Sequence, residues 1–520
     1  MSSITHHHNK STGVTYVYSV ESYWDKKKKA PRNKQICIGK VDPETGEVVP
    51  TRRRRKIVER AVATPGVTVS AKVAGPYLVL ERITEELNIR KLLKQCFPED
   101  FEFMLSLVYL IVQKGIPLSR SGAWSFGALH PFQDVITSQR VSELLRRVFE
   151  DDRQRFISLW LKRIAEKEFL CYDITSVSSY GKGNEYVKFG YNRDNDPLKQ
   201  INLAMLFGQR SGLPAYYRRM PGNISDVATL KTTVKALDFL GAEKMSVVLD
   251  RGFYSLANID ELYRRRHKFT IALPAGRKWV ERIIDEHLDG IASPENYLSI
   301  DKDEALYAST TLHKWGEKKH RAYVHVFYNA ERAATDFDKF TRRLISYKHE
   351  LESGERVERH EEFYQRYFKI KETPKRGLRI EYEENEIQKQ RKKYCGFFCV
   401  LSNTIKSPLK ALEVYREKDV VENCFDDLKN HLDMKRLRVH NSAAMDTRLF
   451  LQFIALIYVS HIRKTTRNDE KLKYLTVREV MDEMESLVEI KYSGRYGEVF
   501  TERSPIQRHI LNAFEVEIRT

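Results

Sequence analysis

One stretch of the chain, residues 168–176 with the sequence EFLCYDITS, constrains the fold more than any other. Its apolar and β-branched residues are typical of a buried strand, yet Asp173 stands near its middle. An ionised carboxylate in a central strand is costly unless a basic group, backbone N–H donors or a metal ion compensates it. A second strand-like run, MSVVL at 245–249, ends directly in Asp250 and a turn-like Arg-Gly pair. Two predicted strands thus each deliver an acid, and a third ligand would complete a site for a hard cation.

The order of predicted elements around these acids indicates how the two strands meet. Three strand-like runs precede a helix that Ser225 or Asp226 can cap, and two more strands follow. These elements cover residues 168–176, 200–207, 213–220, 226–240, 245–249 and 269–273. This is the order of a ribonuclease H-like core, an α/β fold whose mixed sheet carries flanking helices and whose first and fourth strands are neighbours. We therefore expect Asp173 and Asp250 to lie side by side.

Shifts in composition predict the remaining organisation of the 520 residues. The segment between the fifth strand and residue 394 is far too long for a loop and mixes strand-like with helical runs. The helical region before the core is typical either of an ordinary amphipathic bundle or of a domain for DNA ends or dimerisation. We predict a basic N-terminal β module and tether (1–66), a helical DNA-binding or dimerisation region (67–165), a catalytic core in two parts (166–274 and 394–465), an α+β insertion subdomain (275–393) and a C-terminal region (466–520).

The charge of the chain favours a polyanionic partner. The formal net charge is +18, and 31% of the residues are charged. Nucleic acid is the first candidate and an anionic membrane the second. The longest apolar runs, 103–112 and 449–459, are too short to span a bilayer, so we expect no membrane partner. Six scattered cysteines without CxxC spacing indicate reduced core thiols rather than a zinc site.

Two basic runs flank the N-terminal β module, near Tyr23 and Trp24. Such runs are commonly solvated surface or tether, but beside aromatic side chains they also suit contacts with DNA phosphates. The candidates are Lys26, Lys27, Arg52, Arg53, Arg54 and Arg55. The polar start of the chain, with His6, His7 and His8, is expected to be a disordered tail.

A third acid is predicted on a helix over residues 412–432. Tyr415, Lys418, Glu422 and Lys429 share one stripe of that helix, because steps of three, four and seven return to nearly the same angle. The simpler interpretation is an exposed ion pair between Lys418 and Glu422, worth a few tenths of a kcal/mol. The two strand-borne acids favour the other interpretation, in which Glu422 faces the same edge of the sheet.

Together these features resemble the DDE transposases of bacterial insertion sequences, of the insertion-sequence-four type. The resemblance rests on Asp173, Asp250 and Glu422 in that order, on the runs DRGF at 250–253 and PGNISD at 221–226, and on the helix with Tyr415, Glu422 and Lys429. The group's signature is Tyr, two residues, Arg, three residues, Glu, six residues, Lys. Here Lys418 stands in place of the Arg, which keeps the charge and loses the bidentate fork. The resemblance covers roughly residues 169–460 and includes an insertion between the second Asp and the Glu.

The resemblance implies the chemistry and the partners. Asp173, Asp250 and Glu422 would be the catalytic, metal-binding acids for two Mg²⁺ ions, with Mn²⁺ as a substitute, and Tyr415, Lys418 and Lys429 would hold the DNA backbone. The expected reaction is cleavage at transposon ends and joining of the freed 3′-OH to target DNA. Expected partners are double-stranded DNA, as terminal inverted repeats and as target, and a second copy in a synaptic homodimer, in a prokaryotic cytoplasm at the nucleoid.

Three points remain open at the level of sequence. By resemblance, Trp279 or Trp315 in the insertion would stack on a flipped base, although a core tryptophan is the commoner role for each. A ribonuclease H-like nuclease that cuts without joining is an alternative enzyme. A non-catalytic DNA-binding regulator derived from a transposase is an alternative of another class, and three close acids argue against it.

Overall fold

The structure is a computed structural model that describes residues 2–25, 29–51, 69–165, 168–181, 184–240, 245–299, 305–373, 377–437, 439, 441–493 and 497–518. Contacts along the chain define two compact units. One comprises Met1–Val69 and Tyr492–Gly497, and the other Ser70–Lys491 and Glu498–Thr520. The basic candidates Lys26, Lys27, Arg52, Arg53, Arg54 and Arg55 lie outside the described residues.

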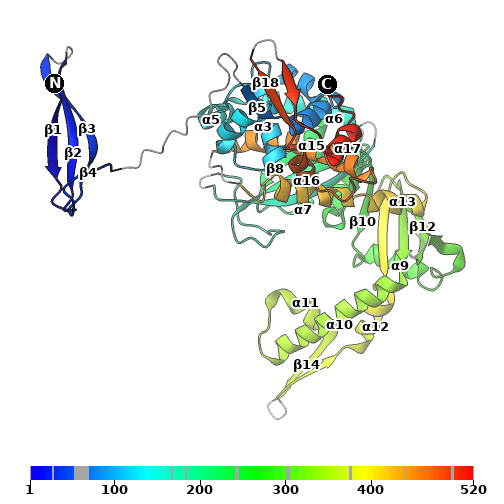
Figure 1. The fold of residues 1–520 in the computed structure, drawn as a ribbon. Helices are drawn as coiled ribbons and strands as arrows, with labels where there is room; N and C mark the ends of the chain where they lie inside the picture. Colours follow the sequence, from blue (N-terminus) through cyan, green and yellow to red (C-terminus); the bar gives the residue numbers. More distant parts are fainter. Residues whose placement is uncertain are drawn as a thin grey trace. The chain divides into compact units, whose positions relative to one another are not determined.

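The first unit contains a four-stranded antiparallel sheet of order β1-β2-β3-β4, drawn in blue in Figure 1. Its strands are β1 (Ser2–His8), β2 (Thr15–Asp25), β3 (Ala30–Val41) and β4 (Val48–Val49). These strands lie in the segment predicted as an N-terminal β module. The predicted disordered tail was wrong, because β1 pairs with β2 along its whole length and Gly13, at φ +68°, closes the turn between them. A strand partner supplied the backbone hydrogen bonds that the polar composition of the tail did not indicate.

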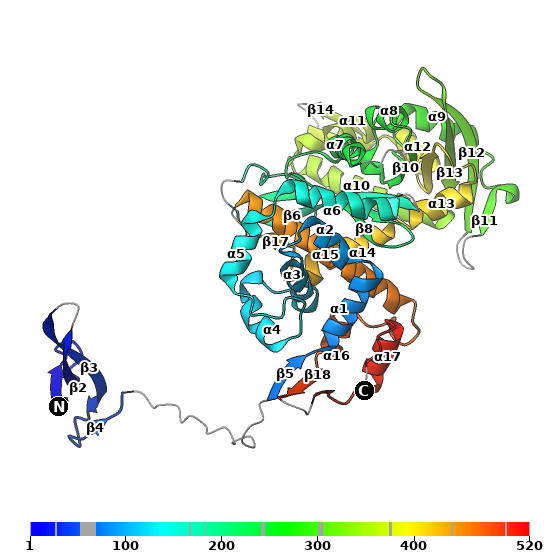
Figure 2. The ribbon, with the colours of Figure 1, turned by 90° about the horizontal axis from the view of Figure 1, so that it is seen from above.

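Helices dominate the start of the second unit. They are α1 (Gly75–Glu86), α2 (Ile89–Cys96), α3 (Phe101–Lys114), α4 (Ser121–Gly127), α5 (Ser138–Arg147) and α6 (Glu150–Ala165), with a 3-10 turn η1 (Leu118–Arg120). The chain turns between α1 and α2 at Asn88, which adopts a left-handed conformation at φ 54°. The later helix α15 (Ser442–Arg467) packs against α3 and α5, as Figure 2 shows. By length and composition α15 is apolar enough to cross a membrane, but 78% of its apolar window is buried inside the protein.

The central sheet has ten strands and mixes parallel with antiparallel pairs. Its order is β11-β12-β13-β16-β10-β9-β6-β7-β8, and β17 (Arg436–Leu437) also pairs with β6. The core strands are β6 (Phe169–Ser179), β7 (Gln200–Gly208), β8 (Pro214–Pro221), β9 (Ser246–Leu249), β10 (Lys268–Leu273) and β16 (Phe397–Ser402). The prediction of a mixed sheet with flanking helices is confirmed. Strands β6 and β9 are neighbours as expected, and they run parallel.

Helices and short turns connect these strands. After β8 and β9 come α7 (Asp226–Phe239), the 3-10 turn η2 (Arg251–Phe253), α8 (Leu256–Arg264) and α9 (Lys278–His287). After β16 come α13 (Pro408–Arg416), α14 (Asp419–Asp426) and a π-helical turn η5 (Asp427–His431). The last elements of the chain are α16 (Val477–Met484), β18 (Val488–Tyr492), β19 (Glu498–Phe500) and α17 (Pro505–Ala513). Strand β5 (Val69–Val73), which precedes α1, joins β18 and β19 in a small sheet of order β19-β18-β5.

The segment predicted as an insertion has two parts. Its first strands, β11 (Tyr297–Ser299), β12 (Ala305–Trp315) and β13 (His320–Tyr328), extend the central sheet through β16. The second part has a hydrophobic cluster of its own, which includes Phe340, Tyr364 and Tyr367. Figure 1 shows this part as a group of elements: α10 (Ala330–Glu352), α11 (Glu361–Tyr367), β14 (Phe368–Thr373), β15 (Gly377–Tyr382) and α12 (Glu384–Lys393).

Candidate active site

Asp173 and Asp250 stand side by side at one edge of the central sheet. Strands β6 and β9 run parallel, with Tyr172 opposite Leu249, so the next residue of each chain is an aspartate. The sequence produces this arrangement locally, because buried apolar residues fill both strands up to the acids. The turn η2 after Asp250 is anchored by Phe253, which is 2% exposed and packs edge-on against Tyr172. This packing accounts for the aromatic residue in the DRGF run.

The two carboxylates have different electrostatic surroundings. Burial raises the pKa of Asp173 from its ordinary 3.8 to about 6, and the neighbouring charge of Asp250 adds to the rise. Two kinds of contact lower the pKa of Asp173 and so oppose this rise. The Ile174 N–H donates to Asp173 Oδ1 at 2.8 Å, and the positive charges of Arg193 and Lys418 lie nearby. Environments that push the pKa values of adjacent acids apart are characteristic of active sites.

Asp250 is held in its ionised form. Burial alone would raise its pKa, but the hydrogen bond from Tyr415 and the charges of Lys418 and Arg251 outweigh burial, and the pKa lies below its usual range. The Tyr415 hydroxyl donates to Asp250 Oδ1 at 2.7 Å. The Lys418 ammonium lies 3.8 Å from the same oxygen and 5.5 Å from the centre of the Tyr415 ring. Two of the signature residues thus converge on one catalytic candidate.

The chain from Arg416 to His431 differs from the single helix expected over 412–432. Helix α13 ends at Arg416, α14 begins at Asp419, and a π turn follows from Asp427. The prediction of one continuous helix was wrong, because steps of three and four cannot reveal a break where tertiary packing redirects the chain. Tyr415 and Lys418 therefore reach Asp250 from the end of α13 and the turn after it.

Glu422 and Lys429 lie beyond that break. Glu422 is exposed on α14, and α14 packs against β6, the strand that carries Asp173. Within the described ranges, no three His, Cys, Asp or Glu side chains are grouped so that they could hold a metal ion. Lys429 forms an ion pair with Asp194, with Nζ to Oδ1 at 2.7 Å. The structure brings Asp173, Asp250, Tyr415 and Lys418 together, and it places Glu422 on the adjacent helix.

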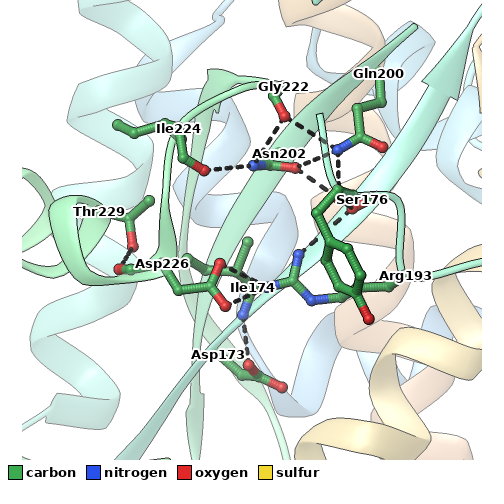
Figure 3. A network of polar contacts seen from close by, with 11 residues as sticks. Asp173, Ile174, Ser176, Arg193, Gln200, Asn202, Gly222, Ile224, Asp226 and Thr229 are labelled. Carbon is green, nitrogen blue, oxygen red and sulfur yellow. Dashed lines mark hydrogen bonds and ion pairs between the residues drawn. The ribbon is translucent and has the colours of Figure 1, made fainter. Parts of the chain in front are cut away.

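A polar network that sequence reasoning missed lies near Asp173, and the charge of its Arg193 acts on that carboxyl (Figure 3). Arg193 donates through Nη2 to both carboxylate oxygens of Asp226, at 2.7 and 2.8 Å. Arg193 Nη1 also donates to the Ser176 hydroxyl at 3.4 Å, and Ser176 lies three residues beyond Asp173 on β6. Asp226 was interpreted from sequence only as a helix cap. The signal for its partner was absent, because Arg193 lies in a polar loop without periodicity.

The PGNISD run forms the rest of this network. The Gly222 carbonyl accepts from Gln200 Nε2 at 3.1 Å, and the Ile224 carbonyl accepts from Asn202 Nδ2 at 3.3 Å. A Cβ on Gly222 would lie 2.1 Å from the Gln200 carbonyl oxygen, so glycine is required by close backbone approach. The buried amides of β7 thereby fix the segment that leads into Asp226.

The two tryptophan candidates have different environments. Trp315 is 5% exposed and donates through Nε1 to Asp260 Oδ1 at 2.7 Å, as a core tryptophan does. Trp279 is half-buried, stacks on His313, and lines a pocket of about 400 Å³ with Tyr254. Three basic residues line the same pocket: Arg277, Lys278 and Arg282. Tyr254 directly follows the DRGF run, so this pocket lies a few residues from Asp250.

The residues present fit a divalent cation at the aspartate pair. Two adjacent carboxylates, one of them with a raised pKa, supply the hard oxygen donors that Mg²⁺ prefers, and a cation would relieve their repulsion. Asp173 and Asp250 are the residues that would hold it.

The sheet order and the aspartate pair define a ribonuclease H-like core with a candidate phosphoryl-transfer site. The family model described as "Transposase DDE domain" matches residues 164–458, more than half of the chain. The chain belongs to this family of transposase enzymes, which generally use divalent metal ions.

Solved structures and curated proteins were also compared with the chain. A cryo-EM structure of a piggyBac transposase synaptic complex with hairpin DNA is 9% identical over 79% of each chain, at a TM-score of 0.37. A Mos1 transposase paired-end complex with the left transposon end is 18% identical over 26% of this chain and 50% of that one, at a TM-score of 0.15. Similarity at this level does not by itself define a fold or a function. No curated protein matches the chain.

Proposed function

We propose that this transposase cleaves DNA at transposon ends and joins the freed 3′-OH to target DNA. The observation that carries the proposal is the placement of Asp173 beside Asp250, with Tyr415 and Lys418 converging on Asp250, inside the matched transposase domain. The resemblance to the insertion-sequence-four type supports the same reaction through the spacing of Tyr415, Lys418, Glu422 and Lys429.

The reaction consists of two displacements at phosphorus. In the first, water attacks a phosphodiester, the bond to the 3′ oxygen breaks, and that oxygen takes up a proton. In the second, the freed 3′-OH attacks a target phosphodiester and gives up its proton, the bond to the target's 3′ oxygen breaks, and that oxygen takes up a proton. Two Mg²⁺ ions, or Mn²⁺ in their place, supply nucleophile activation and stabilise the leaving oxygen when bound.

The side chains of the site have distinct roles in this proposal. Asp173 and Asp250 are cation ligands, and Glu422, carried by the helix that packs on β6, is the third carboxylate. Tyr415 and Lys418 hold the DNA backbone in this proposal. The hydrogen bond from Tyr415 also orients Asp250, and the 23% exposure of Lys418 supports its contact with a phosphate oxygen. Lys429 contacts the DNA backbone only after it exchanges its Asp194 partner.

Further parts of the proposal concern DNA and assembly. Double-stranded terminal repeats and target DNA are the substrates, and a homodimer holds two ends, at the nucleoid of a prokaryotic cytoplasm. The net charge of +18 supports a polyanionic substrate. Trp279, which faces a pocket with three basic residues, is the better placed base-stacking candidate, and Trp315 is committed to its bond with Asp260.

The experiment incubates the protein with Mg²⁺, a labelled duplex that carries the inverted repeats flanking its gene, and a target plasmid. Joined products are expected. Nicks without joining would replace the proposal with a nuclease, and shifted but intact DNA would replace it with a binding protein.

The third acid is tested separately with Glu422→Gln. This variant should lose cleavage and joining while it retains DNA binding in a mobility-shift assay. Glu417→Gln, exposed in the turn before α14, is the matched control and should stay active. Retained cleavage by Glu422→Gln would remove Glu422 from the site without touching Asp173 and Asp250.

A further inference from the structure

A cavity of about 470 Å³ lies away from the aspartate pair, between α5, η1, the segment after η5 and α15. Val141 and Leu145, one helical turn apart on α5, form one apolar wall. Met434 and Leu437 form a second apolar wall, from the segment after η5. The volume is in the range typical of small-ligand sites, and two aliphatic walls suit a flat apolar body between them.

Arg448 lines this cavity from α15, and Asp433, which lines the same cavity, is the acid whose charge acts on it. Arg448 is half-buried, and no residue of the described segments gives its side chain a hydrogen bond or an ion pair. Burial lowers the pKa of its guanidinium to about 10, although the charge of Asp433 works in the other direction. Arg436, which lines the same cavity, is satisfied instead: its Nε lies 2.9 Å from Asp196, and it donates to the Tyr180 hydroxyl at 3.0 Å.

An unpaired guanidinium in such a position is unfavourable for the fold by itself. It carries five N–H donors, and partial burial weakens their contacts with water while none of the described residues supplies an acceptor. An anionic ligand with several acceptor oxygens would satisfy it, and the planar fork of arginine matches phosphate geometry.

Two further features of the cavity favour an anion with polar edges. Helix α5 begins at Ser138 on the cavity wall, and the positive end of a helix dipole attracts negative charge. Ser138 and Ser142 bring hydroxyl groups to the same wall as Val141. A cationic end, hydroxyl groups and two apolar walls together describe a site for a phosphate joined to a planar base.

We propose that this cavity binds a nucleotide, with its phosphate on Arg448 and its base between the walls formed by α5 and by residues 434–437. The nucleotide is either free or part of a DNA strand, and the chemistry of recognition is the same. The inference does not rest on the proposed cleavage and joining, because the cavity shares no lining residue with the Asp173–Asp250 site.

The test measures binding to the full chain in EDTA, which leaves the aspartate pair without divalent ions. Deoxyadenosine monophosphate should bind and raise the melting temperature. Deoxyadenosine should bind at least about tenfold more weakly, because it lacks the charge-assisted contacts to Arg448. A short single-stranded oligonucleotide identifies the source: a strand nucleotide predicts tighter binding of the oligonucleotide, and a free nucleotide predicts equal or tighter binding of the monophosphate.

Arg448→Met separates a binding role from a structural one. We expect it to lose nucleotide binding while its melting temperature stays the same or rises by about 2 °C or more, because an unpaired charge is removed. Arg436→Met, which breaks the ion pair with Asp196, should instead lower the melting temperature. Ser142→Trp fills the cavity, leaves Arg448 in place, and should also abolish binding.

Three results would overturn the inference. The first is absence of monophosphate binding by the wild-type chain, and the second is equal binding of the monophosphate and deoxyadenosine. The third is retained binding by Ser142→Trp together with a lower melting temperature of Arg448→Met, which would make Arg448 a structural residue.

Discussion

Replacing Asp173 with asparagine should stabilise the protein at neutral pH while it abolishes strand cleavage. Asparagine keeps the shape of the side chain and an oxygen that can accept from the Ile174 N–H, now 2.8 Å from Oδ1. What it removes is a carboxylate charge beside Asp250, in surroundings that disfavour ionisation. The variant therefore separates the cost of the charge from the packing of the side chain.

The magnitude follows from the pKa of Asp173, which the fold raises from 3.8 to about 6. A carboxyl whose pKa is higher in the folded chain than in the unfolded chain stabilises the folded state when the carboxyl is protonated. That contribution is fully present below about pH 4 and is lost as the pH rises through about 6. The difference of roughly two pH units corresponds to about 3 kcal/mol at pH 7.5, and a domain of this size should melt several degrees higher when the charge is removed.

The assay is thermal unfolding of the wild-type chain and Asp173→Asn in EDTA, from pH 4 to pH 7.5. The two proteins should melt together near pH 4, and the variant should gain a growing advantage up to pH 7.5. Adding Mn²⁺ at pH 7.5 should raise the melting temperature of the wild-type chain only, because a bound cation compensates the carboxylates of the folded state.

Asp250→Asn is the matched control and should act with the opposite sign. The pKa of Asp250 is lowered, so its ionised form stabilises the fold above its unfolded pKa, and this contribution is lost as the pH falls. Since its side chain is 48% exposed, solvent screening limits the effect to less than about 1 kcal/mol. The reasoning is refuted if Asp173→Asn is less stable than wild type at pH 7.5, or if its advantage does not change with pH.

Three other substitutions test parts of the site. Tyr415→Phe removes the 2.7 Å hydrogen bond to Asp250, which is worth roughly 1 to 2 kcal/mol for a charged acceptor. Because this bond lowers the pKa of Asp250, its loss should raise the pH at which Mn²⁺ binding is half-maximal, and an unchanged titration would contradict this. Lys418→Ala should slow strand cleavage by at least about tenfold and lower the salt dependence of DNA binding, whereas Lys418→Arg should restore both. Gly222→Ala should destabilise the protein by about 2 kcal/mol or more, measured by urea unfolding, because its Cβ meets the Gln200 carbonyl; wild-type stability would rule out the close approach.

The amino-acid sequence by itself determined the central part of the fold. The apolar runs that carry Asp173 and Asp250, and the order of strands and helix between them, were sufficient to predict neighbouring strands with adjacent acids. The reason is that strand periodicity and burial are local properties, and a known strand order converts them into a spatial arrangement. The resemblance assigned Tyr415 and Lys418 to the DNA backbone, and their contacts with Asp250 appeared only in the structure.

Only the tertiary structure decided how each charge is satisfied. The break between α13 and α14, the capture of Lys429 by Asp194 and the bracing of Asp226 by Arg193 join residues from separate segments. The raised pKa of Asp173 depends on burial by the assembled sheet, and the cavity around Arg448 exists only where α5 and α15 meet. Desolvation and ion pairing act over a few ångströms in space and have no period along the chain, so no pattern in the sequence could reveal them.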